Sequence, residues 1–366
     1  MSTTPVPGNL PTPELMAESF YVYDVEATEN GVRYYGEPLG EEENVLRSVA
    51  PLFRERGYRV TISYETGEHV LVATERSTSV EGVPWKNVLL FFATVLTTLF
   101  AGSRWYGIDV LSDPVAVFRA WPFALSVMGV LAVHELGHYV LSRHHDVQAS
   151  LPYFIPIPNV IGTLGAVISM NDNMPSRRAL FDIGVAGPLA GLGATVIVTA
   201  VGVSLPPVGT EGSALVGQLD LGYPLLVQGI AAVLGQPLDY GAGQTVNPVV
   251  VGGWIGAFIT FLNLLPVGQL DGAHVARALV SDRVRLLERL VPAFLFGLAG
   301  YLFVFRGGQS AFIWVLWGVL ALVFSRIGAV TPIDETPVGS RRRTVGAVTL
   351  VLGVLCFTPV PITVTV

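Results

Sequence analysis

The chain has 366 residues, of which 51% are hydrophobic and only 13% are charged. A typical soluble domain is about 25% charged, so this composition favours a membrane protein. The formal net charge is −7 and the arginines are dispersed, which argues against a nucleic-acid partner. The chain has one cysteine, Cys356, so an internal disulfide is excluded.

The first 82 residues differ from the remainder in pattern. Residues 1–15 contain proline, threonine and glycine, and we expect them to be disordered. Alternating apolar residues predict strands, and apolar residues at helical spacing predict one helix between them. The expected strands are 20–28, 31–36, 58–65 and 69–76, the helix is 41–56, and the second hairpin turns at Thr66-Gly67. We therefore expect a small cytosolic α+β domain of ββαββ order over residues 16–82.

Residues 83–366 carry the apolar runs of a polytopic α-helical membrane protein. The runs are long enough to predict about seven transmembrane helices. The expected spans lie near residues 86–102, 121–142, 179–204, 249–266, 290–305, 310–325 and 344–358. The run 223–234 is too short to span a bilayer, so it is interpreted as an interfacial or re-entrant helix.

Arginine asymmetry predicts the orientation of these spans in the membrane. If the N-terminus is cytoplasmic, the cytoplasmic side carries Arg143, Arg177, Arg178, Arg277, Arg283, Arg285, Arg289, Arg326 and Arg341 to Arg343. The opposite side then carries only Arg104, Arg119 and Arg306, and the loop 205–248 has no lysine or arginine. Positive residues concentrate on the cytoplasmic side of membrane proteins. We therefore expect a multi-pass protein of the cell membrane, embedded in the lipid bilayer, with a cytoplasmic N-terminus.

An H-E-x-x-H motif occupies residues 134–138, inside the apolar run 122–141. On a helix, His134 and His138 project from one face toward a single metal ion, and Glu135 can take a proton from a metal-bound water. The motif also occurs by chance, and its usual non-functional explanation is a solvated helix face. Apolar neighbours make that explanation inadequate here, and ionisable residues at membrane depth are costly unless they have a function.

A third ligand is needed for a catalytic zinc site, because such sites use three protein ligands and one water. Asp271 is a candidate, since it follows the apolar span that starts near residue 249. An aspartate before a glycine is also common in turns and helix caps. The same segment carries Asn263 at membrane depth and Pro266, which should break the helix before the aspartate.

These two motifs together resemble the site-2 protease family of intramembrane zinc metalloproteases. The second motif reads N-x-x-P-x-x-x-L-D-G over residues 263–272. The segments 151–156, 162–166 and 181–191 further resemble the branch that contains the plant plastid EGY proteases. The similarity is strong over about residues 120–280, which we take as the catalytic core of a transmembrane domain spanning residues 83–366.

The resemblance implies an intramembrane zinc metalloendopeptidase that cleaves transmembrane segments of membrane proteins. It implies one Zn²⁺ per chain, held by His134, His138 and Asp271, with Glu135 as the general base that assists attack by zinc-bound water. It also implies a catalytic role for Asn263 in holding the substrate or the developing oxyanion. The active site is then expected toward the cytoplasmic side.

The stretch 162–170 matches a segment that folds as a membrane-dipping β-loop in members of the family. Such a loop could pair with an unwound substrate as an added strand. An ordinary hydrophobic connector is the alternative. The residues expected to bind substrate are Gly162, Thr163, Leu164, Gly165, Ala166, Asn263 and Pro266.

Two other functions remain open from the sequence. One is a catalytically inactive relative that acts as a membrane scaffold or chaperone, although such relatives usually lose a ligand or the base. The other is a transporter with an incidental metal site, because glycine-rich spans broken by proline also occur in carriers. Among the remaining histidines, His144 and His145 are expected to face solvent, and His274 is a candidate for supporting the metal ligands.

Overall fold

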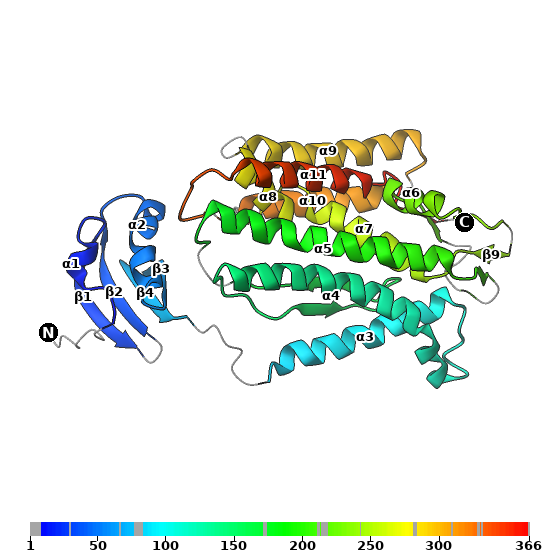
Figure 1. Ribbon diagram of the computed structural model, residues 1–366, viewed down its shortest axis with the longest axis horizontal. Coiled ribbons are helices and arrows are strands. Elements are labelled where there is room, and N and C mark those ends of the chain that lie inside the picture. The colour runs from blue at the N-terminus through cyan, green and yellow to red at the C-terminus, as the bar shows by residue number, and fades with distance from the viewer. Residues whose placement is uncertain are drawn as a thin grey trace.

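The computed structural model describes residues 9–28, 31–65, 67–76, 83–170, 174–210, 213, 219–241, 243–280, 284–308, 310–327, 330 and 332–364. A small α+β domain lies beyond one end of a larger domain of roughly parallel helices (Figure 1). The C-terminus lies at the opposite end of these helices (Figure 1).

The N-terminal domain is a four-stranded antiparallel sheet with one helix packed against it. Its elements are β1 (Phe20–Thr28), β2 (Gly31–Pro38), α2 (Glu42–Arg54), β3 (Tyr58–Glu65) and β4 (Glu68–Glu75), with strand order β1-β2-β4-β3. Val45, Val49 and Phe53 recur at helical spacing on α2 and are buried against the sheet. The strands and the helix lie where the sequence predicts them. The turn residue Thr66 lies outside the described residues.

The prediction that residues 1–15 are disordered is wrong for residues 9–15. Residues Pro13–Met16 form the short helix α1, and Leu10 and Met16 are buried in the core of the domain. The hydroxyl of Tyr34 donates a hydrogen bond of 2.9 Å to the carbonyl of Pro11. Local composition could not indicate this, because the order comes from apolar contacts with residues far along the chain. Residues 1–8 lie outside the described residues.

The larger domain contains a helix at each of the seven expected spans. The helices are α3 (Trp85–Trp105), α4 (Trp121–His144), α5 (Arg177–Ser204), α7 (Val249–Asn263), α9 (Val284–Phe305), α10 (Ala311–Ile327) and α11 (Ser340–Leu355). Among the described residues, four segments are long and apolar enough to cross a membrane. They are α3, the 3₁₀ helix η1 (Pro114–Ala120) continuing into α4, α5, and most of α9.

The polytopic membrane architecture therefore stands, while seven full spans are not confirmed. The helices α7, α10 and α11 have 15, 17 and 16 residues. Helices of these lengths reach about 23–26 Å, which is less than the hydrocarbon thickness of about 30 Å. The segment expected to be interfacial contains the nine-residue helix α6 (Leu225–Val233).

Three helices, α4, α5 and α7, pack closely because glycines line their contacts. A Cβ at Gly137 on α4 would lie 2.6 Å from the backbone oxygen of Ala186 on α5. A Cβ at Gly256 on α7 would lie 2.3 Å from the hydroxyl of Thr195, also on α5. Backbones can approach this closely only where side chains are missing. The packing brings the helix with the H-E-x-x-H motif against the two helices that complete its surroundings.

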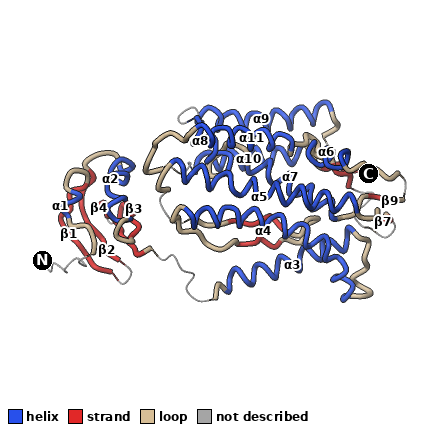
Figure 2. The backbone as a smooth tube through the Cα atoms, viewed as in Figure 1, coloured by secondary structure: helices blue, strands red, loops and turns tan. Residues whose placement is uncertain are grey.

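The stretch expected to form a β-loop is half of a hairpin beside α3 and α4 (Figure 2). Strand β5 (Tyr153–Pro156) pairs antiparallel with β6 (Thr163–Val167). Side chains of α3 hold the hairpin through the Asn87 amide to the Leu151 carbonyl at 2.9 Å, and the Trp105 indole to the Val160 carbonyl at 2.8 Å. The Thr97 hydroxyl donates to the Gly162 carbonyl at 2.6 Å.

The two domains contact each other at the end of α4. The guanidinium of Arg54, at the end of α2, donates to the backbone oxygens of His145 and Asp146 at 3.1 and 2.9 Å. The guanidinium of Arg76 also donates to the Asp146 oxygen. These donors satisfy carbonyls that a helix leaves unpaired at its C-terminus. At the far end of the helices, short strands form two further two-stranded sheets, β7 (Val208–Gly209) with β9 (Gln244–Thr245) and β8 (Leu219–Leu221) with β10 (Ile362–Val364).

Candidate metal centre

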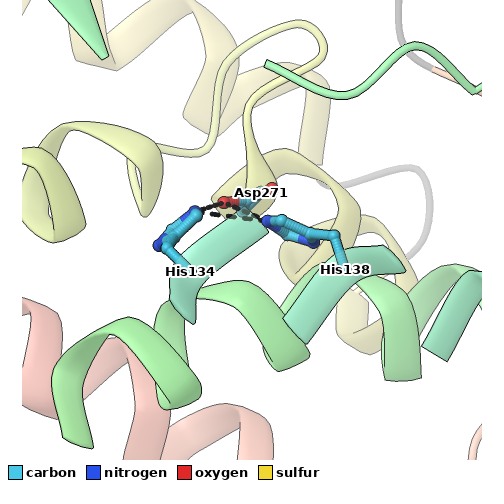
Figure 3. Close-up of side chains that lie close together, drawn as sticks. All are labelled: His134, His138 and Asp271. Carbon is cyan, nitrogen blue, oxygen red and sulfur yellow. Dashed lines mark hydrogen bonds and ion pairs between the residues drawn. The ribbon is translucent and has the colours of Figure 1, made fainter. Parts of the chain in front are cut away.

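His134, His138 and Asp271 converge at the junction of α4 and α8 (Asp271–Val280), as Figure 3 shows. His134 and His138 are four residues apart, so their imidazoles lie on the same face of α4. The Asp271 Oδ2 atom lies 3.3 Å from His134 Nε2 and 3.2 Å from His138 Nε2. The two Nε2 atoms lie 3.2 Å apart. Both histidines are buried, and the Asp271 side chain is 14% exposed.

These separations fit a tetrahedral metal ion. Zinc binds imidazole nitrogen and carboxylate oxygen at about 2.0–2.2 Å, so two ligand atoms at a tetrahedral angle lie about 3.3–3.5 Å apart. The three observed separations of 3.2–3.3 Å agree with that value. The donor set of two nitrogens and one oxygen is typical of catalytic zinc sites, which leave one position for water.

A backbone carbonyl of α5 fixes the tautomer of His138. His138 Nδ1 lies 2.8 Å from the carbonyl oxygen of Ile183. A carbonyl oxygen can only accept a hydrogen bond, so Nδ1 carries the proton and the neutral ring presents the Nε2 lone pair to a metal. A metal-binding histidine is commonly oriented in this way through its second nitrogen.

Three glycines of α5 form the surface on which the imidazoles of the site lie. A Cβ at Gly187 would lie 2.0 Å from His138 Nε2, and a Cβ at Gly191 would lie 2.8 Å from His134 Nδ1. A Cβ at Gly184 would lie 2.8 Å from the His274 Cβ. None of these glycines was expected to belong to the site. Their spacing of three and four residues, on a helix that crosses α4, is the signal that could have identified them.

The loop after α7 places Asp271 opposite α4. Helix α7 ends at Asn263, and Pro266 cannot continue it, as the sequence predicts. Gly268 has a φ of +58°, which favours glycine, and reverses the chain. A Cβ at Gly272 would lie 2.0 Å from the Leu264 carbonyl oxygen. The glycine of the L-D-G sequence therefore lets α8 start directly against the end of α7.

The three ligand side chains border a cavity of about 170 Å³. It is lined by His134, Glu135, His138, Ala166, Val167, Ile168, Met170, Asn263, Gln269, Leu270, Asp271 and His274. Glu135 is 6% exposed, and the Asn263 amide nitrogen lies 3.2 Å from His134 Nε2. The cavity is therefore lined by the three residues able to hold a metal ion, by the carboxylate of Glu135 outside that set, and by the amide of Asn263.

The residues expected to bind substrate are only partly at this cavity. Ala166 and Asn263 line it, whereas Gly162, Thr163, Leu164, Gly165 and Pro266 do not. The chain continues from β6 along the cavity through Val167, Ile168 and Met170. Gln269, Leu270 and His274 also line it and were not expected to contact substrate, because their positions depend on how the loop after α7 folds.

His145 does not face solvent as expected. Its Nε2 atom lies 3.0 Å from an oxygen of Asp182 on α5. The guanidinium of Arg342, on α11, makes two hydrogen bonds of 2.7 Å to the same carboxylate. Planar Arg–carboxylate pairs of this kind are the geometrically specific ones. They tie α11 and the end of α4 to the turn of α5 that orients His138.

Comparisons with known proteins agree with this geometry. The chain is 32% identical to a protein named "Probable zinc metalloprotease EGY1, chloroplastic" from Arabidopsis thaliana over 252 residues, which cover 67% of this chain and 44% of the relative. It is 27% identical to "Probable zinc metalloprotease EGY2, chloroplastic" from Oryza sativa subsp. indica over 362 residues, covering 94% of this chain and 64% of the relative. The chain thus spans about half the length of these relatives. No solved structure matches it.

A match to a family model identifies the family of the chain. The model described as "Peptidase family M50" matches residues 122–305, which are half of the chain. The matched region starts in the helix that carries His134 and His138 and extends beyond Asp271, so it contains all three possible ligands. The similarity to EGY proteins agrees with the branch indicated by the sequence motifs. The chain belongs to peptidase family M50, the family of the site-2 proteases.

Proposed function

We propose that this chain is an intramembrane zinc metalloendopeptidase that cleaves transmembrane segments of membrane proteins. The observation that carries the proposal is the set of three possible ligand atoms 3.2–3.3 Å apart, two of them on buried histidines, between apolar helices and beside Glu135. Two of the three ligands lie on a helix long and apolar enough to cross a membrane. Family membership and the names of the relatives support peptidase chemistry.

Each residue at the cavity has a separate role in the proposed hydrolysis. His134, His138 and Asp271 would hold zinc, which supplies Lewis-acid polarisation of a water molecule and of the peptide carbonyl. Glu135 takes a proton from the attacking water while the oxygen of that water bonds to the scissile carbon. Glu135 then passes the proton to the leaving amine as the C–N bond breaks. Asn263 lines the same cavity, and we assign to its amide the donation of a hydrogen bond to the carbonyl oxygen as it becomes negative.

The hairpin β5–β6 is the proposed site of substrate presentation. A transmembrane helix satisfies its backbone groups internally, so a substrate must unwind before its peptide bond becomes accessible. Leu164 and Val167 on β6 are 64% and 52% exposed, and the chain that follows β6 borders the cavity. An unwound segment that pairs with β6 as an added strand would be led toward Glu135.

The arginine asymmetry supports a cytoplasmic position for the N-terminal domain. The domain contacts the end of α4, and Arg143 and Arg177 lie at the nearby ends of α4 and α5. With that orientation, water reaches the site and product leaves it on the cytoplasmic side. The alternative of an inactive scaffold is less favoured, because the ligands, Glu135 and Asn263 are all present at one cavity.

The test compares three forms of the full chain, purified in detergent and reconstituted with a transmembrane substrate. Wild-type protein should bind about one zinc per chain and cleave. Glu135→Gln should retain zinc, and its rate should fall by about 10²- to 10⁴-fold, because it loses the base and not a ligand. His134→Ala should lose both zinc and cleavage.

Zinc content is measured by elemental analysis and cleavage by mass spectrometry of the fragments. Cleavage by Glu135→Gln at nearly the wild-type rate would remove Glu135 from the mechanism. The scaffold would be favoured if wild-type protein retained zinc but cleaved none of the substrates tested, including those with helix-weakening residues.

A further inference from the structure

Asp182 lies on helix α5, one residue before Ile183, whose carbonyl oxygen orients His138. The carboxylate of Asp182 accepts hydrogen bonds from two other elements. The Arg342 guanidinium, on α11, donates to both carboxylate oxygens at 2.7 Å. His145, the residue that caps the C-terminus of α4, donates from Nε2 at 3.0 Å. The Asp182 side chain is 17% exposed, so one partly buried carboxylate joins α5 to both α4 and α11.

Two hydrogen bonds connect α4 with α5 at the same level of α5. One runs from His138 Nδ1 to the Ile183 carbonyl at 2.8 Å, and the other runs from His145 to Asp182. The two histidines are seven residues apart, about two helical turns, so they lie on one side of α4. Their partners are consecutive residues of α5. A shift of α5 along α4 that broke the second bond would therefore also move the Ile183 carbonyl away from the imidazole.

The glycines between α4 and α5 do not fix this register by themselves. At Gly137, for example, the α4 backbone lies directly against the Ala186 backbone oxygen. Such contacts let backbones approach, but they lack the side-chain ridges that resist sliding. A partly buried ion pair often stabilises a protein no more than apolar packing would, because its charges lose water. A planar Arg–carboxylate pair instead provides a specific geometry. The Asp182 cluster is therefore better explained by the register that it fixes than by stability.

We propose that Asp182 is a positioning residue for the metal centre, which sets the register of α5 against α4. The bonds from Arg342 and His145 hold Asp182 in place, and Asp182 in turn keeps the Ile183 carbonyl on Nδ1 of His138. The inference rests on the proposed zinc peptidase function. Asp182 does not line the cavity, so it acts through His138 and not on the substrate. Without it, the Nε2 lone pair of His138 is less well directed at a metal.

Two substitutions in the full chain test the positioning role through metal binding. Asp182→Asn keeps the size of the side chain but removes its charge and turns one acceptor into a donor that faces other donors. Its zinc affinity, measured by competition with a chelator, should fall about tenfold, the lower end of the loss on changing an outer partner. Arg342→Lys keeps the charge without the planar fork and should lose about threefold. Co²⁺ bound in place of zinc should show an altered visible spectrum in Asp182→Asn, because the ligand geometry changes.

A second ion pair between helices provides the control for stability. Glu288 on α9 pairs with Arg277 on α8 at 3.4 Å, with side chains 15% and 19% exposed, and neither residue lines the cavity. Glu288→Gln should lower the Tm as Asp182→Asn does, while its zinc affinity stays within about twofold of wild type. Equal losses of zinc affinity in the two variants would assign the effect to general destabilisation. A lower Tm in Asp182→Asn with wild-type zinc affinity and cobalt spectrum would show a structural tie only. Either result overturns the proposal.

A double substitution tests whether Asp182 acts through the His138 ring. A Cβ at position 187 would lie 2.0 Å from His138 Nε2, so Gly187→Ala should displace the ring by itself. Adding Asp182→Asn should then lower zinc affinity by less than about threefold more, whereas independent effects would multiply in full. Full multiplication would overturn the proposal. These measurements need no substrate, so a chain that binds zinc as expected but does not cleave would contradict the proposed function and leave the role of Asp182 standing.

Discussion

Glycine residues determine where the imidazoles of the metal centre can lie. His138 occupies the space that a side chain at position 187 would fill, and His134 lies against position 191. The ring of His138 is also fixed by its hydrogen bond to the Ile183 carbonyl. Helix α5 therefore supplies none of the three candidate ligands. Its glycines leave space for the imidazoles, and one of its backbone oxygens orients His138.

A methyl group at position 187 should displace the His138 ring. The Cβ would lie 2.0 Å from Nε2, the ligand atom, so Gly187→Ala should weaken zinc affinity by about 10- to 100-fold, as loss of a ligand's supporting contacts does. Zinc affinity is measured by competition with a chelator. Gly193→Ala is the control on the same helix, because nothing lies within 4 Å of a Cβ at that position.

The control should leave zinc affinity unchanged and stabilise α5 by about 0.5–1 kcal/mol, because alanine favours a helix interior more than glycine. Equal zinc affinity in Gly187→Ala and wild type would show that the ring can shift without harm to the site.

The three residues that converge at the candidate metal centre, His134, His138 and Asp271, could be selected from the sequence. Two histidines four residues apart define one helix face, and the second motif supplied Asp271 by resemblance to a family. The spacing from Asp271 indicated that His274 lies near the site, but the role of Gly187 and the packing of His274 on Gly184 could not be predicted in this way. Both depend on which residues of different helices come into contact, and that follows from packing across α4, α5 and α8.

The hairpin β5–β6 is an element whose position depends on α3. Three polar side chains of that helix, Asn87, Thr97 and Trp105, donate to backbone oxygens of the hairpin or its flanking residues. The sequence indicated a β-loop at 162–170 by resemblance alone. It could not show that the partner strand is 153–156, or that the three α3 side chains satisfy carbonyls near the hairpin.

A proline at position 164 should test pairing between β6 and an unwound substrate. Leu164 has no Cα partner in the register with β5, in which Thr163 pairs with Pro156 and Ala166 with Phe154. Leu164→Pro removes a backbone donor and fixes φ while leaving those pairs in place. We expect cleavage to fall by at least about tenfold while zinc content stays normal, because one of few main-chain contacts to the substrate is lost.

Leu164→Val is the matched control, since it keeps the donor and the side chain is 64% exposed. It should cleave within about twofold of wild type, because β-branched residues suit strands. Normal cleavage by Leu164→Pro would mean that the hairpin is a structural connector and that substrate is recognised elsewhere.

At the scale of the whole molecule, the positions of the helices follow from apolar runs, and every expected span contains a helix. The number of full spans does not follow from these runs, because α7, α10 and α11 are shorter than a typical membrane is thick. The contact between domains was also not predictable. It depends on Arg54 and Arg76, whose partners are backbone oxygens at the end of α4 and leave no pattern in the sequence.

The orientation of the whole chain can be tested with single cysteines. Cys356 is buried and is replaced by alanine to give a background without thiols. Gln236→Cys lies in the arginine-free loop 205–248, and Glu55→Cys lies in the N-terminal domain, both at exposed positions. Because positive residues face the cytoplasm, a membrane-impermeant thiol reagent added to intact cells should label Gln236→Cys. Glu55→Cys should react only after lysis, which controls for reactivity of the thiol itself. The reverse pattern would place the N-terminal domain outside, and cleavage products would then be released away from the cytoplasm.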